Sequence, residues 1–120
     1  MGGFGALDLA RVAPGRFCAV GGHSAALWLS GAETPAGAFD DAEDFSRHDL
    51  IGAARSHRLY SVPVWIDVGR DDPFLQADSA LARELAVHGT HVSLHVHGGG
   101  HGGWSKRMPQ YLRFYVAACA

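Results

Sequence analysis

The stretch Pro63-Val64-Trp65-Ile66-Asp67-Val68-Gly69 decides the fold. It is a nearly continuous run of β-prone residues, which is typical of a strand buried on both faces of a parallel sheet. Residues 73–87 follow, with Leu81 and Leu85 on one stripe and Gly89 as the stop, and this pattern predicts an amphipathic helix. A buried strand that leads directly into a helix favours an α/β fold.

The same alternation of strand and helix continues towards the C-terminus. Residues 91–97 alternate with period two, so they predict a strand with Val92, Leu94 and Val96 on one face. Glycines 98–100 and His101 come next. Residues 104–118 then predict an amphipathic helix, with Pro109 in its first turns, where proline is tolerated. The expected apolar stripe of this helix consists of Tyr111, Leu112, Tyr115 and Val116.

Signals are weaker towards the N-terminus. Residues 2–12 predict a helix that stops at Pro14-Gly15, and residues 17–20 predict a short strand closed by Gly21-Gly22. Beyond it the pattern blurs into an irregular excursion, in which 25–29 fit one helical turn, 31–44 a loop and 49–54 a short helix. Strands alternating with helices predict right-handed βαβ units and a parallel sheet within one domain.

Composition excludes several classes of protein. With 120 residues, 48% of them apolar, the chain has the composition of an ordinary globular protein. Its net charge of -2 gives no indication of a basic surface that would bind nucleic acid. No run of about 18 apolar residues is present to span a bilayer. Cys18 and Cys119 are predicted to be two small buried hydrophobic residues rather than a disulfide.

Two loops that follow strands carry the residues that point to chemistry. In open parallel sheets, functional groups gather beyond the carboxyl ends of the strands. Asp72 follows the first strong strand and His101 follows the next one. Alone, each residue has a structural interpretation, because Asp72-Pro73 also suits a helix start and His101 also suits a plain loop. Together, a carboxylate and an imidazole form two-thirds of a serine-hydrolase triad.

Several motifs resemble a known family. Residues 1–7, Met-Gly-Gly-Phe-Gly-Ala-Leu, are similar to the segment that follows the nucleophile in the Putative esterase family of α/β-hydrolases, near esterase D and the mycolyltransferases. Residues 69–74 resemble its acid motif, and Gly99-Gly100-His101 with Trp104 resembles its histidine loop. The resemblance covers essentially the whole chain. It implies that residues 1–120 form a partial domain, the C-terminal half of an α/β-hydrolase fold, with a mostly parallel sheet flanked by helices.

The resemblance also implies a role for individual residues. Asp72 takes the part of the acid, in preference to Asp71, because the family's acid stands three residues after the strand-ending glycine. His101 takes the part of the general base, and the backbone N–H of Met1 forms half of the oxyanion hole. Trp104 is expected to wall the acyl pocket. The nucleophilic serine, together with any targeting segment, would lie before Met1.

Two alternatives stay open beside this interpretation. Ser24, in the sequence Gly-His-Ser-Ala-Ala, is a weaker candidate nucleophile, because Ala26 stands where a tight elbow prefers glycine. The other interpretation of Ser24 is a polar residue at a strand end. The histidines of residues 91–97 share one strand face, but without a matching set of carboxylates or thiols we predict no metal site. The remaining histidines, His23, His48, His57 and His88, are expected to be surface groups.

The predicted function is therefore that of a serine-type carboxylic ester hydrolase, or acyltransferase, which needs no cofactor and takes a small-molecule ester. Without the serine, residues 1–120 are expected to be a truncated chain that is inactive alone. The rival interpretation is a non-catalytic partial hydrolase domain that binds a partner through an exposed sheet edge. Substrate choice is expected to lie in the excursion 31–49. The sequence makes no prediction for the acyl and alcohol groups, the compartment or the oligomeric state.

Overall fold

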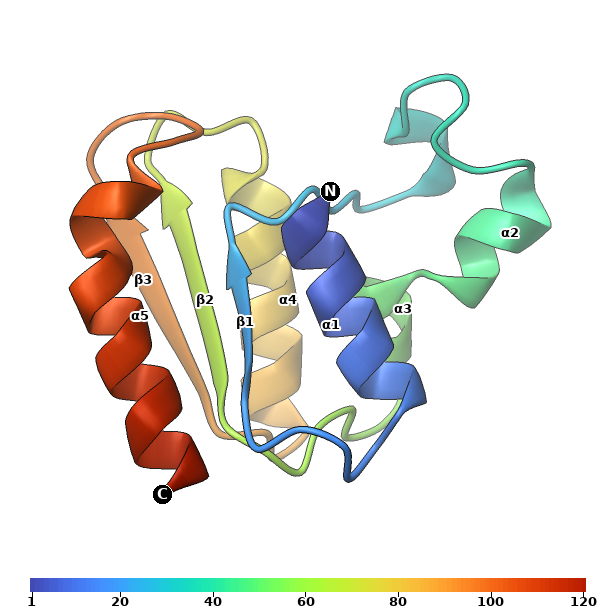
Figure 1. Cartoon of the computed structure of the whole chain (residues 1–120). Helices are drawn as coiled ribbons and strands as arrows, with labels where there is room; N and C mark the ends of the chain where they lie inside the picture. Colours follow the sequence, from blue (N-terminus) through green and yellow to red (C-terminus); the bar gives the residue numbers. More distant parts are fainter.

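Three parallel strands form the centre of the computed structural model, which describes residues 1–120. They are β1 (Val20–His23), β2 (Val64–Gly69) and β3 (Val92–His97), and they lie in the order β1-β2-β3. In the register, Gly22 lies beside Ile66, and Val64 lies beside Val92. The three carboxyl ends therefore meet at one edge of the sheet (Figure 1).

Helices cover both faces of this sheet (Figure 1). Helices α1 and α4 pack on one face, α3 packs against α4 on the same side, and α5 packs on the other face. The excursion between β1 and β2 carries a short 3-10 helix, η1, before α2 and α3. The bounds of the helical elements are α1 Gly2–Val12, η1 Gly31–Glu33, α2 Ala42–Arg47, α3 Leu50–Ala54, α4 Leu75–Val87 and α5 Trp104–Cys119. None of these helices is long and apolar enough to cross a membrane.

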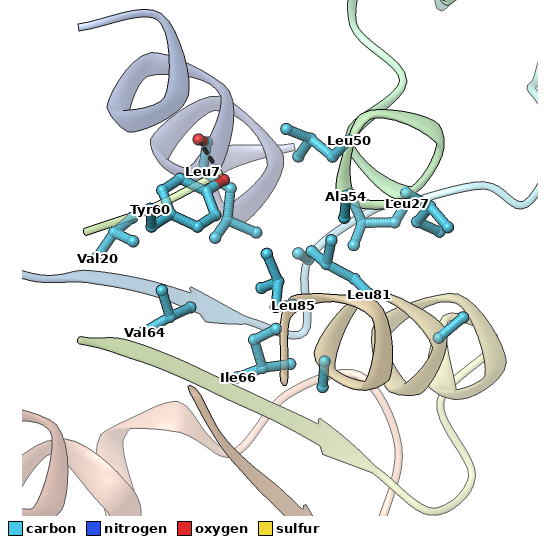
Figure 2. Close-up of a cluster of buried hydrophobic side chains, with 14 of the residues drawn as sticks. Leu7, Val20, Leu27, Leu50, Ala54, Tyr60, Val64, Ile66, Leu81 and Leu85 are labelled. Carbon is cyan, nitrogen blue, oxygen red and sulfur yellow. Dashed lines mark hydrogen bonds between the residues drawn. The ribbon is translucent and has the colours of Figure 1, made fainter. Parts of the chain in front are cut away.

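The hydrophobic core lies between the sheet and the three helices of the first face (Figure 2). Strand β2 alternates, so that Val64 and Ile66 enter this core, which α1 and α4 complete with Leu7 and Leu81. Each fully buried aliphatic side chain contributes about 1.5–3 kcal/mol by leaving water. Tyr60 closes the core from the loop before β2, and its hydroxyl donates to the backbone oxygen of Leu7 at 2.8 Å.

The predicted order of elements is confirmed, with corrections near the N-terminus. The α/β class, the strands at 63–69 and 91–97 and the helices at 2–12, 49–54, 73–87 and 104–118 are all found, within two residues at each end. The first strand was placed too early, because it begins at Val20 and runs through both glycines that were expected to close it. A Cβ at Gly21 would collide with Tyr115 of α5, so this glycine allows close packing rather than a turn.

Two further expectations for the secondary structure were wrong. The helical turn at 25–29 is absent, and 31–44 contains η1 and the start of α2 rather than loop alone. The stripe of α5 is also narrower than expected. Tyr111 is buried, but Leu112 and Val116 are 55% and 69% exposed, because the row of Arg107, Tyr111 and Tyr115 faces the sheet instead.

A disulfide joins Cys18 to Cys119 with a Cα–Cα distance of 5.2 Å. The prediction of two unpaired buried thiols was therefore wrong. The bond connects the last turn of α5 to the segment before β1, across a sequence separation of 101 residues. It fastens the helix that covers the second face of the sheet to the strand beneath it.

Candidate active site

Asp72 and His101 meet at the carboxyl edge of the sheet. Asp72 follows the end of β2 and His101 follows the end of β3, and the Nδ1 atom of His101 lies 2.9 Å from Oδ2 of Asp72. The aspartate side chain is fully buried, whereas 42% of the histidine side chain is exposed. Because a carboxylate only accepts, this contact keeps the ring hydrogen on Nδ1 and leaves Nε2 as the basic nitrogen. That nitrogen makes no hydrogen bond within the chain.

The second carboxylate oxygen of Asp72 shapes its own loop. Oδ1 accepts from the backbone N–H of Phe74 at 2.8 Å, and the backbone oxygen of Asp72 accepts from Leu75 at 3.1 Å. Asp72 therefore has both of the roles predicted for it, with a different carboxylate oxygen in each. Oδ1 stabilises the turn into α4, and Oδ2 holds the histidine. The turn in this way orients the carboxylate towards His101.

Backbone contacts join the acid loop to the histidine loop. The N–H of Arg70 donates to the backbone oxygen of His97 at 2.8 Å, and the N–H of Asp71 donates to that of Gly99 at 2.9 Å. A side chain at Gly69 would collide with the carbonyl oxygens of Gly99 and its neighbour, so the crossing needs a glycine there. Asp71 contributes its backbone, while the residue itself is exposed.

Trp104 connects the histidine to Ser24. Its ring packs edge-on against His101 with centroids 5.2 Å apart, and its Nε1 donates to Oγ of Ser24 at 3.4 Å. Ser24 is buried and has a φ of +53°, which is unusual for a residue with a side chain. The strained backbone is stabilised by its N–H, which donates to the backbone oxygen of Asp67 at 2.8 Å. Residues 25–28, which follow Ser24, have no regular secondary structure, whereas an elbow would place a helix there.

Met1 lies at the same edge of the sheet. It precedes α1 directly, and Figure 1 shows the N-terminus near the carboxyl ends of the strands. A Cβ at Gly3 would lie 3.0 Å from Ala25, so the first turn of α1 packs against the segment that carries Ser24. Contacts thus run from the start of α1 through Ser24 and Trp104 to His101.

A second carboxylate–imidazole pair lies deeper, between the sheet and α5. Asp67 of β2 is fully buried, and its Oδ1 lies 2.5 Å from Nδ1 of His23. Its Oδ2 accepts from the hydroxyl of Tyr111 at 2.7 Å and lies 3.5 Å from Nε of Arg107. The other nitrogen of His23 lies 2.9 Å from the hydroxyl of Tyr115. The prediction of His23 as a surface group was therefore wrong.

These partners set the ionisation of the buried groups. Burial raises the pKa of Asp67, but the hydrogen bonds from His23 and Tyr111 and the charge of Arg107 outweigh it, so the net pKa lies below the ordinary value. Burial and the neighbouring carboxylate raise the pKa of Tyr111 to about 12. A charged residue inside the buried run 63–69 was the signal for this cluster, because a buried charge requires partners.

A third buried carboxylate belongs to Asp78 of α4. Neither of its two oxygens accepts a hydrogen bond from another side chain. Burial, and then the charges of Asp72 and Asp67, raise its pKa to about 8. Asp78 is therefore uncharged at neutral pH, which lowers the cost of burying it.

The other histidines make separate contacts. His95 stacks on Trp65 with centroids 3.7 Å apart, and Nε2 of His97 is buried 3.6 Å from Asp67. His48, predicted to be a surface group, has 38% of its side chain exposed, and its Nδ1 lies 2.7 Å from a carboxylate oxygen of Asp8. No group of three or more His, Cys, Asp or Glu side chains is arranged to hold a metal ion.

A row of aromatic rings leads from the histidine into the excursion. Phe74 lies 5.8 Å from His101, Trp28 lies 6.0 Å from Phe74, and Phe39 lies 5.8 Å from Trp28, each as a distance between ring centroids. Phe39 also lines a cleft of about 750 Å³ that is formed by residues of the excursion, from Leu29 to Asp49. The row therefore connects the histidine loop to the one large cleft of the excursion.

Known proteins share this arrangement of elements. The family model described as Putative esterase matches residues 1–114. A solved structure titled ferulic acid esterase is 25% identical, with a TM-score of 0.80 over 98% of this chain and 49% of that one. The S-formylglutathione hydrolase of Staphylococcus aureus is 18% identical, with a TM-score of 0.70 over 97% of this chain and 48% of that one, which shows the fold. The chain thus spans about half the length of these structures. No curated protein matches it.

Proposed function

The chain belongs to the Putative esterase family, and from that premise we propose that Asp72 and His101 are the acid and the base of a serine-type carboxylic ester hydrolase. The observation that carries the proposal is the 2.9 Å contact between the buried carboxylate and Nδ1 of the histidine, with Nε2 left free at the strand ends. This is the geometry that a general base in acyl transfer requires.

The mechanism follows from that geometry. Nε2 of His101 takes the proton of a serine hydroxyl as its oxygen attacks the ester carbonyl carbon, and Asp72 stabilises the imidazolium that forms. The histidine then gives this proton to the departing alcohol, which leaves an acyl-serine. A water molecule, deprotonated by the same nitrogen, releases the carboxylic acid and restores the serine. Each step moves one proton through Nε2, so this nitrogen must face the substrate.

The serine itself belongs, in this proposal, directly before Met1. The close approach of Gly3 to Ala25 supports this position, because the neighbouring Ser24 contacts Trp104, which packs against His101. The backbone N–H of Met1 would then be an oxyanion donor. Without that serine, residues 1–120 should lack turnover, since dismantling a triad costs about 10⁶-fold in a well-studied protease. Ser24 is a weak alternative, because its hydroxyl contacts Trp104 and no helix follows it.

We propose further that the aromatic row and the excursion cleft contact the apolar part of the ester. The row consists of half-buried rings that begin at the histidine, so an acyl group attached at the reacting carbon would lie against Phe74 and Trp28. The name of the 25% identical structure, ferulic acid esterase, agrees with an aromatic acyl group.

A non-catalytic role remains the rival. It is favoured by the outer edge of β1, which pairs only with β2, and by the row of Met108, Leu112 and Val116, which are about half exposed or more. Exposed strand edges and apolar patches are typical of surfaces that bind another polypeptide. Such a surface would also suit the strand that carries the serine.

The experiment uses the DNA upstream of Met1 and p-nitrophenyl acetate. We expect an in-frame Gly-x-Ser codon triplet whose serine directly precedes Met1, and we expect the extended protein to exceed residues 1–120 by at least about 10³-fold in kcat/KM. Asp72→Asn should remove most of that gain, whereas His57→Ala, which changes an exposed histidine outside the site, should keep it.

Two results would contradict the proposal. An in-frame stop directly upstream would exclude the serine before Met1. Turnover by residues 1–120 that is lost in His101→Ala and Ser24→Ala would instead assign the nucleophile to Ser24.

A further inference from the structure

The histidine loop, residues 98–103, is expected to be flexible unless contacts with the rest of the protein restrain it. Residues 98–103 contain five glycines around His101, and Gly99 and Gly103 have φ values of +95° and +73°. Glycine loses more backbone entropy on folding than any other residue, so such a loop samples many conformations unless contacts restrain it. Proton transfer requires a well-placed nitrogen, because displacement by about 1 Å can lower a rate by about 10²-fold.

Besides the bond from His101 to Asp72, hydrogen bonds to backbone oxygens hold this loop on each side of the histidine. Before it, the backbone oxygen of Gly99 accepts from Asp71 at 2.9 Å, as described above. After it, the backbone oxygen of Gly102 accepts from Nη2 of Arg107 at 2.7 Å. The second bond is charge-assisted, and such bonds are about twice as strong as neutral ones. It holds the residue that directly follows His101.

Arg107 is itself fixed by the buried cluster on its other side. Its Nε donates to the hydroxyl of Tyr111 at 3.1 Å and lies 3.5 Å from Oδ2 of Asp67, while only 18% of its side chain is exposed. Asp67 is in turn restrained, because hydrogen bonds with His23 and Tyr111 engage its two oxygens and β2 holds its backbone. The guanidinium thus extends from a fixed carboxylate in the sheet to a glycine loop at its edge.

We propose that Arg107, anchored by Asp67, is a positioning residue for His101. The geometry favours arginine over lysine, because a planar guanidinium directs separate N–H groups to Tyr111 and to Gly102 at once, while an ammonium is a single point of charge. The proposal depends on the proposed function only for its effect on catalysis. The restraint on the loop can be measured without any turnover.

The test compares Arg107→Gln and Arg107→Lys with Arg113→Gln, which removes an exposed arginine from the same helix. In ¹H–¹⁵N spectra of residues 1–120, the Nδ1–H signal of His101 reports its bond to Asp72. We expect this hydrogen to exchange with water about tenfold faster in both Arg107 variants and unchanged in Arg113→Gln. The amide signals of β2 and the Cys18–Cys119 disulfide check that each variant is folded.

The extended protein then separates this inference from the proposed function. If it hydrolyses p-nitrophenyl acetate, Arg107→Lys should lower kcat about 10- to 100-fold with little change in KM, since substrate binding is left intact. If the extended protein is inactive, the proposed function fails while the exchange measurement still decides the positioning role. Equal exchange at His101 in folded Arg107→Gln, Arg107→Lys and Arg113→Gln would overturn the inference.

Discussion

The molecule contains two carboxylate–imidazole pairs that differ in what surrounds the ring. In the pair of Asp72 and His101, one ring nitrogen is bound and the other has no partner in the chain. In the pair of Asp67 and His23, both ring nitrogens have partners, and the ring stacks on Tyr111 with centroids 3.7 Å apart. The same two groups are therefore placed as a candidate base at the strand ends and as a structural support inside the sheet.

The comparison teaches that location along the strand separates these roles. Asp67 lies within β2 and faces α5, so its partners come from a packed helix. Asp72 lies three residues beyond the end of β2, so its histidine comes from a loop that reaches solvent. Arg107 and the backbone connect the two pairs. We expect changes in the buried pair to affect mainly the free energy of unfolding, and changes in the open pair to affect mainly the rate of reaction.

The largest expected effect comes from the disulfide, because it fastens the helix that completes the buried pair. Replacing both Cys18 and Cys119 by serine should lower the free energy of unfolding by about 4.7 kcal/mol, as expected for a closed loop of this length. Urea unfolding followed by tryptophan fluorescence measures it. Reductant should lower the midpoint of the wild type and leave the double variant unchanged. Equal wild-type midpoints with and without reductant would show that the bond contributes nothing.

The next effect tests the buried pair itself. Asp67→Ala leaves Arg107, Tyr111 and His23 without their common acceptor, so it should lower the free energy of unfolding by about 3–4 kcal/mol. The control is Asp71→Ala, which removes an exposed carboxylate and should stay within about 0.5 kcal/mol of the wild type. Similar losses in the two variants would mean that the buried network contributes no more to the free energy of unfolding than an exposed carboxylate does.

Asp78 extends the comparison of the two pairs, since it is a buried carboxylate that has no imidazole as a partner. The unfolded chain loses this proton near pH 4, whereas the folded protein keeps it up to about pH 8. Its contribution to stability is therefore fully present below pH 4 and is lost as pH rises towards 8, at up to about 1.4 kcal/mol per pH unit.

Asp78→Asn should remove that contribution to the pH dependence. Between pH 5 and pH 7, the free energy of unfolding of the wild type should fall by about 2.6 kcal/mol relative to the variant. Urea midpoints across that range, with Asp71→Asn as the control for an exposed carboxylate, provide the measurement. Parallel curves for wild type and Asp78→Asn would contradict the raised pKa.

Much of the fold follows from local pattern, but the buried cluster does not. Residues 63–69 and 91–97 show strand periodicity, and Asp72 and His101 each follow such a strand, so their meeting was predictable. The disulfide was missed because two cysteines 101 residues apart carry no spacing signal. The role of His23 depends on Asp67, 44 residues away, and on α5, which only the tertiary fold brings together.

Two glycines caused the error in the bounds of the first strand. Gly21 and Gly22 were interpreted as the end of a strand, but they lie within β1 because Tyr115 and Leu7 leave no room for side chains. A glycine needed for close packing has the same appearance in a sequence as one needed for a turn. By contrast, Gly69 stands at the strand end that was expected of it.

The most direct measurement is the kcat of the extended protein for p-nitrophenyl acetate, with His101→Ala and His23→Ala assayed together. Both variants change a histidine that contacts a buried aspartate, so the comparison isolates the open nitrogen. We predict that His101→Ala lowers kcat by about 10⁴-fold or more, while folded His23→Ala stays within about tenfold of the wild type. Equal losses in the two variants, or a larger loss in His23→Ala, would contradict the assignment of His101 as the base.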